Sequence, residues 1–216
     1  MLEPMAEFFE ARLAGYDEHM LREIEGAEEF YPFTAEHLPR TPGAAVLDLG
    51  CGTGLELEYY LARNPSARIT GIDLSEKMLE TLAGKFPGRD LRLIRGSYFE
   101  VPLGENAFDG AVSVESLHHF TQPEKTGLYR KLSKALKPGG FFLLTDYFAS
   151  DDEEEDRWFR ELARLKAENG ITDDRFYHYD TPLTVAHEVE ALTAGGFRKV
   201  EILKAWGATF TLKAYR

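Results

Sequence analysis

The spacing of apolar residues changes along the chain and separates helical from strand-like stretches. Near the N-terminus they recur at three- and four-residue steps from Met5 to Ile24, the period of an amphipathic helix that ends near Gly26. After a break at Pro32, a shorter helix is expected over 34–38. Both stretches precede the first strand-like run, so we expect them to form a helical lid.

From residue 44 onward, short apolar runs alternate with helical patterns. The strand-sized runs lie near 44–49, 68–73, 91–95, 108–114 and 140–146. The helical patterns lie near 54–63, 75–85 and 123–136. This alternation predicts βαβ units and a parallel sheet that helices cover on both faces.

The last seventy residues predict a cap and a strand pair. An acidic run at 150–156 is typical of a helix N-terminus, because carboxylates offset the positive end of the helix dipole. A further helix begins at Thr181 or Thr184, and two antiparallel strands are expected over 197–203 and 209–215. We therefore expect a single α/β domain over 1–216 with four parts: a lid (1–43), a core (44–146), a helical cap (147–183), and a C-terminal helix with a β-hairpin (184–216).

Composition narrows the class of protein. The chain has 216 residues, of which 44% are hydrophobic, and its one Cys excludes an intrachain disulfide and a cysteine-only zinc cluster. No apolar run approaches the ~20 residues of a membrane span. The N-terminus is acidic where a signal peptide is basic. We expect a cytoplasmic monomer or homodimer with no membrane partner.

The net charge of −12 is unevenly distributed. Residues 1–43 hold 3 basic and 10 acidic side chains, and residues 147–183 hold 5 and 11. The acidity therefore belongs to the lid and the cap. Because nucleic-acid binding relies on basic surfaces, this distribution weighs against a nucleic-acid partner.

The sequence VLDLGCGTG at residues 46–54 is the most informative segment. An apolar strand enters a turn with glycines at alternate positions, and a helix follows. Without Cβ atoms the backbone passes close to a ligand, and free N–H groups at the helix N-terminus attract a negative or electron-rich group. Asp73 ends the next strand, where a carboxylate can accept hydrogen bonds from ribose hydroxyls. The segment predicts an adenosyl cofactor.

The spacing of the glycines indicates which cofactor this is. Dinucleotide turns follow G-x-G-x-x-G, because the pyrophosphate is wrapped at the helix start, whereas here the third glycine comes one residue early. Asp48 adds a negative charge, which suits a cofactor that carries an ammonium or sulfonium better than it suits a phosphate. Both features favour S-adenosylmethionine over NAD.

These residues resemble the class I, Rossmann-like S-adenosylmethionine-dependent methyltransferases. The segments similar to that family's motifs are DLGCGTG (48–54), DLSEKML (73–79), FDGAVSV (108–114) and LKPGG (136–140). The resemblance implies a doubly wound, mostly parallel seven-stranded sheet whose last strand, 209–215, is antiparallel. It also implies that Leu74 and Met78 lie against the adenine, and that Glu115 lies near the methionyl part of the cofactor.

The expected cofactor-binding residues are Tyr16, Asp48, Gly50, Cys51, Gly52, Gly54, Asp73, Leu74, Met78, Ser97, Tyr98 and Glu115. Ser97 follows a glycine at a position where many relatives carry an acid that accepts from the adenine amino group. A serine accepts more weakly than a carboxylate. Cys51 is expected to fill space and not to act as a nucleophile, because no base is evident beside it.

The acceptor of the methyl group is expected to bind beyond strands four and five, under three covering segments. These are the N-terminal helix with Tyr16 and His19, the segment 115–120, and the insertion 147–184. His119, or His118, is the first candidate for a general base, because imidazole titrates near neutrality. His178, in the aromatic cluster 176–180, is a further candidate. Packing explains each of these side chains about as well.

No metal ion is expected. Asp146 ends strand five, where metal-using catechol-type methyltransferases keep a ligand, but no matching Asp-Asn pair follows it. The sequence thus predicts an S-adenosylmethionine-dependent methyltransferase that acts on an O or N atom of a small molecule. Three alternatives stay open: a tRNA-modifying methyltransferase using Arg89, Arg92 and Arg95, a non-catalytic S-adenosylmethionine-binding protein, and, disfavoured by the glycine spacing, a nicotinamide-dependent oxidoreductase.

Overall fold

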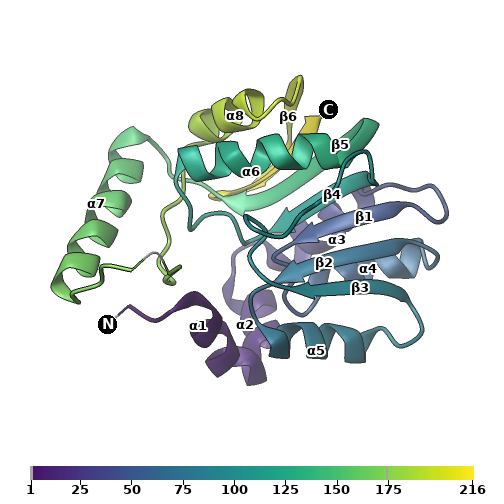
Figure 1. The fold of residues 1–216 in the computed structure, drawn as a ribbon, viewed down its shortest axis with the longest axis horizontal. Helices are drawn as coiled ribbons and strands as arrows, with labels where there is room; N and C mark the ends of the chain where they lie inside the picture. The colour runs from purple at the N-terminus through teal and green to yellow at the C-terminus, as the bar shows by residue number, and fades with distance from the viewer. Residues whose placement is uncertain (1, 174) are drawn as a thin grey trace.

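A computed structural model describes residues 2–173 and 175–216, and a seven-stranded sheet forms its centre (Figure 1). In spatial order the strands are β3 (Asp90–Arg95), β2 (Arg68–Asp73), β1 (Ala45–Leu49), β4 (Phe108–Val114), β5 (Leu136–Tyr147), β7 (Thr209–Tyr215) and β6 (Lys199–Trp206). β1 to β5 pair in parallel, whereas β7 runs antiparallel between β5 and β6. This is the predicted sheet, with the antiparallel last strand in the predicted place.

The strand β5 begins four residues earlier than the apolar run suggests. Leu136 pairs with Phe108, and the register then shifts so that Phe141 pairs with Gly110. The glycine-containing turn at 136–140 is accommodated as an irregularity in the strand. The segment 136–140, which was expected only to precede the strand, is therefore part of it.

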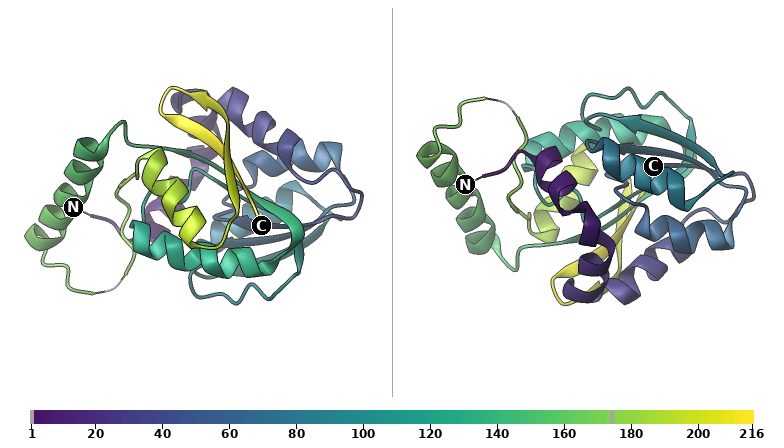
Figure 2. Two further views of the ribbon diagram at one scale, coloured as in Figure 1. Left: turned by 90° about the horizontal axis from the view of Figure 1, so that it is seen from above. Right: turned by 90° about the horizontal axis from the view of Figure 1, so that it is seen from below.

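Helices cover both faces of the sheet, as the alternation predicts (Figure 2). α3 (Ala27–His37), α4 (Leu55–Arg63) and α5 (Glu76–Lys85) share one hydrophobic cluster, which Val46 of β1 joins. α6 (Gln122–Ala135) and α8 (Val185–Ala194) share the other, which the next residue, Leu47, joins. Successive strand residues point to opposite faces, so both sides of β1 are buried.

The lid differs from its prediction in two ways. The expected continuous helix is wrong, because it divides into α1 (Met5–Arg12), a 3₁₀ turn (Leu13–Gly15) and α2 (Tyr16–Glu23). Gly15 leaves the helical region with φ −144° and lets the chain change direction.

The expected break at Pro32 is also wrong, because α3 continues through this residue. A proline inside a helix frees the carbonyl four residues earlier, here that of Glu28. Glu28 lies in the exposed first turn, where water can satisfy its carbonyl.

The cap is an arm beside the sheet. As predicted, α7 (Asp152–Glu168) begins at the acidic run. Its N-cap is Asp151, and the helix stands apart from the sheet in Figures 1 and 2. The chain then returns, and its backbone bonds both to the lid, from Met5 N–H to the Phe176 carbonyl (2.9 Å), and to the core, from Thr181 N–H to the His118 carbonyl (2.7 Å). No helix within residues 2–173 and 175–216 has both the length and the apolar character needed to cross a membrane.

Candidate active site

Two neighbouring cavities lie at the carboxyl ends of the central strands. The narrow cavity, of about 50 Å³, has walls that include Gly50, Gly52, Asp73, Leu74, Met78 and Tyr98. The wide cavity, of about 600 Å³, has walls that include Phe8, Arg12, His19, His118, Tyr147, His178 and Asp180. Phe9, Tyr16, Glu115 and His119 line both. The two cavities therefore meet at these four side chains.

The floor of the narrow cavity is the glycine turn between β1 and α4. Gly50 has φ +73°, and a Cβ atom built on it would lie 2.0 Å from Oγ of Ser116, in the loop after β4. Gly54 has φ +77°, and its Cβ would press on Leu82 of α5 at 3.1 Å. The turn thus needs glycine both for its backbone angles and for close contacts with two other elements.

Asp73 at the end of β2 is held against this turn. Its Oδ2 accepts a hydrogen bond from Gly52 N–H (2.9 Å), and its Oδ1 accepts one from Ser75 N–H (2.8 Å). Burial raises the pKa of Asp73, and these backbone bonds counteract the rise. Each carboxylate oxygen keeps acceptor capacity for a further hydroxyl. These acceptor oxygens fit the hydroxyl donors of an adenosyl ribose, with Leu74 and Met78 as adjoining apolar surface.

Asp48 and Glu56 bury their carboxyl groups behind the turn. Asp48 is 1% exposed and lies outside the walls of both cavities. Burial, and then the charge of Glu56, raise the pKa of Asp48 well above its usual range. Asp48 therefore does not present a negative charge to the narrow cavity, contrary to the reasoning from its sequence position.

The structure brings eight of the expected cofactor-binding residues to the narrow cavity: Tyr16, Gly50, Gly52, Asp73, Leu74, Met78, Tyr98 and Glu115. Asp48, Cys51, Gly54 and Ser97 lie outside it. Cys51 packs behind the turn, where a Cβ on Gly71 would lie 2.7 Å from its Sγ, and burial raises the pKa of its thiol. The Ser97 hydroxyl accepts from Phe99 N–H (3.2 Å) in its own loop.

The lid is fastened over the narrow cavity by polar contacts. Asp17 of α2 accepts from the Thr53 hydroxyl (2.5 Å) and from Lys85 Nζ (2.5 Å). Glu10 of α1 pairs with Lys77 of α5 (3.7 Å). These contacts hold the lid across the glycine turn and α5, beside the narrow cavity.

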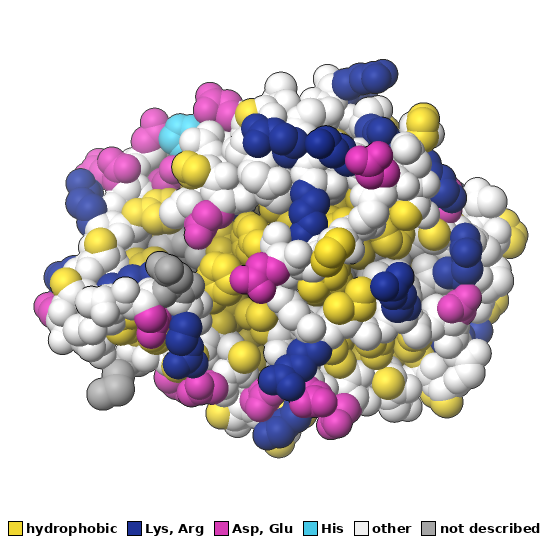
Figure 3. All heavy atoms as spheres, viewed as in Figure 1, with side chains coloured by type: hydrophobic (Ala, Val, Ile, Leu, Met, Phe, Trp, Pro, Cys, Tyr) yellow, Lys and Arg dark blue, Asp and Glu magenta, His cyan; other side chains and the backbone are white. Residues whose placement is uncertain are grey.

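The walls of the wide cavity are largely aromatic. Phe8 and His178 stack with ring centroids 3.5 Å apart and planes 7° apart. Phe9 meets both His178 and Tyr16 edge-on. In Figure 3, hydrophobic side chains gather near the middle of the face that adjoins the α7 arm. A ligand of this cavity would contact rings on several sides.

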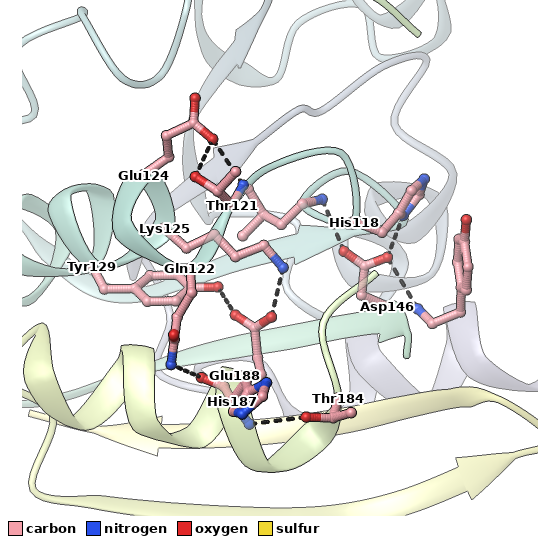
Figure 4. Close-up of polar contacts among 12 residues, drawn as sticks. His118, Thr121, Gln122, Glu124, Lys125, Tyr129, Asp146, Thr184, His187 and Glu188 are labelled. Carbon is pink, nitrogen blue, oxygen red and sulfur yellow. Dashed lines mark hydrogen bonds and ion pairs between the residues drawn. The ribbon is translucent and has the colours of Figure 1, made fainter. Parts of the chain in front are cut away.

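His118 is paired with Asp146 beneath the wide cavity (Figure 4). Its Nδ1 lies 2.5 Å from Oδ1 of Asp146, whose Oδ2 accepts from Leu117 N–H (2.8 Å). Burial opposes a charge on His118, but the Asp146 carboxylate outweighs it and raises the pKa of His118 to about 9. His118 therefore holds a proton at neutral pH and is not available as a base.

His119 and His178 have the opposite character. Burial and then the charge of His118 lower the pKa of His119. Burial and then His119 lower the pKa of His178 to about 4. Both rings are neutral near pH 7, so each has one nitrogen lone pair that can take a proton.

Glu115 lies at the junction of the two cavities. It has φ +48°, an uncommon conformation for a residue with a side chain, and its N–H donates to the Thr145 carbonyl (2.8 Å). Burial, followed by the charge of Asp146, raises its pKa to about 8. Its carboxyl group is therefore mostly protonated at neutral pH.

Comparison with known proteins identifies the family. The model of a methyltransferase domain family matches residues 46–140. An uncharacterized methyltransferase of Geobacillus kaustophilus is 30% identical over 185 residues, which cover 86% of this chain and 82% of that protein. This chain belongs to the class I S-adenosylmethionine-dependent methyltransferases.

Other relatives of this methyltransferase differ from it in length. A sterol 24-C-methyltransferase of Gibberella zeae is 29% identical over 175 residues, covering 76% of this chain but 42% of the relative. The chain spans about two fifths of the length of such sterol enzymes. In fold it is similar to a putative O-methyltransferase from Nostoc punctiforme, with a TM-score of 0.73 at 20% identity, covering 99% of this chain and 62% of that one.

The sequence did not single out two acidic side chains of the methyltransferase site as functional. From the sequence, Asp146 stands out at the end of the fifth strand only as the place of a metal ligand, although this edge is also where other ligands bind. Asp180 belongs to the aromatic cluster 176–180 but has no role of its own there, because the histidines that it meets, His118 and His119, lie far away in the sequence. Side-chain nitrogen and carboxylate oxygen atoms of His118, His119 and Asp180 lie within 4.8 Å of one another, and so do those of Glu115, His118 and Asp146. The sequence did not indicate these two clusters.

Proposed function

We propose that this enzyme transfers the methyl group of S-adenosylmethionine to an oxygen or nitrogen atom of a small, largely apolar molecule bound in the wide cavity. The observation that carries this proposal is the junction of the two cavities at Phe9, Tyr16, Glu115 and His119. A cofactor in the narrow cavity and an acceptor in the wide one would meet there, between the lid and the sheet.

The bound cofactor supplies an electrophilic methyl group on a sulfonium. The chain's own residues align the reactants, exclude water and manage one proton. The acceptor atom would bond to this methyl carbon, and the electron pair of the broken carbon–sulfur bond would leave with the sulfur. The acceptor's proton must leave, and His119, neutral and facing both cavities, is the side chain we assign to take it.

The size and walls of the wide cavity support an acceptor that carries rings. Its volume of about 600 Å³ lies in the range typical of small-molecule sites. The rings of Phe8, Phe9 and His178 favour an apolar body. The sterol methyltransferases among the relatives are named for an apolar ring system, which agrees with this class.

A tRNA acceptor is less well supported. The lid and the cap that border the wide cavity carry most of the acidic charge of the chain. Among the basic candidates, Arg95 is already paired with Glu76 (2.9 Å). A cytoplasmic location and a monomeric or dimeric state stay predictions from the sequence.

Calorimetric titration followed by a transfer assay tests the proposal. S-adenosylmethionine and S-adenosylhomocysteine should bind, and NADH should not. If NADH alone bound tightly, this chain would not use S-adenosylmethionine. The second step is transfer of a radiolabelled methyl group to a panel of phenols, aryl amines, sterols and bulk tRNA. Labelling of tRNA alone, or cofactor binding with no labelling across the panel, would contradict a small-molecule acceptor.

A further inference from the structure

Asp180 brings a carboxylate from the cap against three imidazoles of the wide cavity. Its Oδ1 lies 3.2 Å from Nδ1 of His119, 3.6 Å from Nε2 of His118 and 3.9 Å from Nε2 of His178. This oxygen is buried, and no hydrogen bond of ordinary geometry from the described residues reaches it. A buried, unsatisfied carboxylate oxygen is costly, so its position calls for a reason.

Docking of the cap does not supply that reason. The cap is already joined to the core through the backbone bond from Thr181 N–H to the His118 carbonyl, and to the lid through that from His178 N–H to the Glu3 carbonyl (2.9 Å). The side chain of Asp180 is 45% exposed although its Oδ1 atom is buried. The carboxylate therefore connects the imidazoles with solvent and adds little apolar packing.

The surroundings of His119 fix which of its nitrogens carries the hydrogen. Nδ1 lies 3.2 Å from the Tyr179 carbonyl oxygen and 3.2 Å from Asp180 Oδ1. Both neighbours are acceptors, so Nδ1 must be the N–H in the neutral ring. The lone pair is then on Nε2, the atom that a general base at the junction of the cavities would use.

The other charged and titratable groups around the cluster include some that favour and some that disfavour a proton on His119. They are Arg12 and His19 from the lid, Glu115, His118, Asp146 and Tyr147 from the strand ends, and His178 from the cap. The charge of His118 disfavours a proton on His119, whereas the carboxylate of Asp180 favours one. Asp180 is the group among these that contacts the His119 ring and stabilises its charged form.

We propose that Asp180 is a positioning residue, which stabilises the charged form of His119 while the Tyr179 carbonyl orients the ring, and so favours the step in which Nε2 takes the acceptor's proton. The role resembles that of the aspartate in a Ser-His-Asp triad, which stabilises the imidazolium without taking its proton. The second half of the proposal rests on the proposed function. The first half is a property of the enzyme without an acceptor and can be measured directly.

The test is NMR of the full chain with ¹⁵N-labelled histidine, recorded before and after dialysis against EDTA. The chain has six histidines, and the spectrum of His119→Gln assigns the signals of His119. In the wild type we expect hydrogen on Nδ1 and a lone pair on Nε2 at pH 7.5. In Asp180→Asn we expect the hydrogen to stay on Nδ1, where the Tyr179 carbonyl still accepts it, and the pKa of His119 to fall further, because the stabilising anion is gone. Asp180→Glu should restore part of the pKa.

Asp173→Asn is the matched control, since Asp173 belongs to the same segment and contacts the exposed Tyr177 hydroxyl (3.2 Å) away from the cavities. It should leave the His119 signals unchanged. Hydrogen on Nε2 in the wild type, or a pKa of His119 that does not respond to Asp180→Asn, would overturn the proposal. So would His119 signals that EDTA shifts, because the cluster would then be holding a metal. Titration with S-adenosylhomocysteine in parallel separates failure of this inference from failure of the proposed function.

Discussion

The narrow and the wide cavity adjoin each other but are built in different ways. The polar contacts of the narrow cavity are short and involve the backbone: Asp73 binds Gly52 N–H and Ser75 N–H, all within one βαβ unit. The wide cavity is assembled from the lid, two strand ends and the cap, which meet only in the folded chain. Its hydrogen bond between the His119 ring and the Tyr179 carbonyl joins residues that are 60 positions apart, against 21 for Asp73 and Gly52.

The difference between the two cavities suggests that binding of the cofactor and methyl transfer depend on different residues. A local motif can hold a cofactor shared by a whole family, because its geometry comes from one turn and the neighbouring strand. A site assembled from distant segments can change its lining without disturbing that turn. We therefore expect substitutions on the two sides to have separable effects.

The largest separation is expected for His119→Gln, which keeps a polar side chain but removes the base. Loss of a general base typically lowers the rate by about 10²–10⁴-fold. The dissociation constant of S-adenosylhomocysteine should change much less, because the substitution leaves Asp73, Leu74 and Met78 of the narrow cavity in place. Single-turnover rates and calorimetry measure the two quantities, and a large loss of cofactor affinity would contradict the division of roles.

Gly50→Ala should damage the cofactor side and the fold together. A positive φ costs an alanine about 1–2 kcal/mol, and overpacking against Ser116 adds about 1–3 kcal/mol. Urea unfolding should show the lower stability, and calorimetry should show at least about tenfold weaker cofactor binding, a factor that corresponds to 1.4 kcal/mol.

Two variants check the physical cause. Adding Ser116→Gly to Gly50→Ala removes the clash but not the strain, so it should restore part of the stability. Gly127→Ala, at an exposed position in α6 where a Cβ meets nothing within 4 Å, should be neutral or stabilising. Equal damage from both alanine variants would show that the close approach at Gly50 is irrelevant.

Glu115 should make the ratio of the affinities for S-adenosylmethionine and S-adenosylhomocysteine depend on pH. Burial raises its pKa to about 8, so its carboxyl is neutral below this value and anionic above it. An anion attracts the sulfonium of S-adenosylmethionine but not the neutral thioether of S-adenosylhomocysteine. Since even in water two charges 4 Å apart interact by about 1 kcal/mol, the affinity ratio should rise about fivefold between pH 7 and pH 9.

Calorimetry at several pH values measures this ratio, and Glu115→Gln should make it flat. A ratio in the variant that still rises through pH 8 would assign the effect to another group.

The smallest effect is expected for the fastening of the lid. Asp17→Asn keeps a partner for Thr53 but weakens the ion pair with Lys85. Partly exposed ion pairs contribute about 0.2–1 kcal/mol, so S-adenosylhomocysteine should dissociate roughly two- to fivefold faster in stopped-flow measurements. Glu18→Gln, which alters the neighbouring exposed pair with Arg22, should leave this rate unchanged. Equal rates in Asp17→Asn and the wild type would mean that these contacts do not hold the lid.

The sequence by itself determined the sheet, the succession of strands and helices along the chain, and the glycine turn with Asp73. These features depend on period and on local backbone geometry, which neighbouring residues encode. The lid was less predictable, because the effect of Gly15 and Pro32 depends on their surroundings. Gly15 divides a helix, whereas Pro32 is tolerated inside one because the carbonyl that it frees lies in the exposed first turn.

Only the tertiary structure decided the protonation of the three histidines. From the sequence, His118 and His119 are adjacent and equivalent candidates for a base. In the fold, Asp146 makes His118 a cation, and that charge together with burial keeps His119 neutral. A pKa depends on the charges and the solvent around a group, and here those come from a strand end and a cap segment far away in the chain. No pattern of neighbouring residues could have assigned the proton.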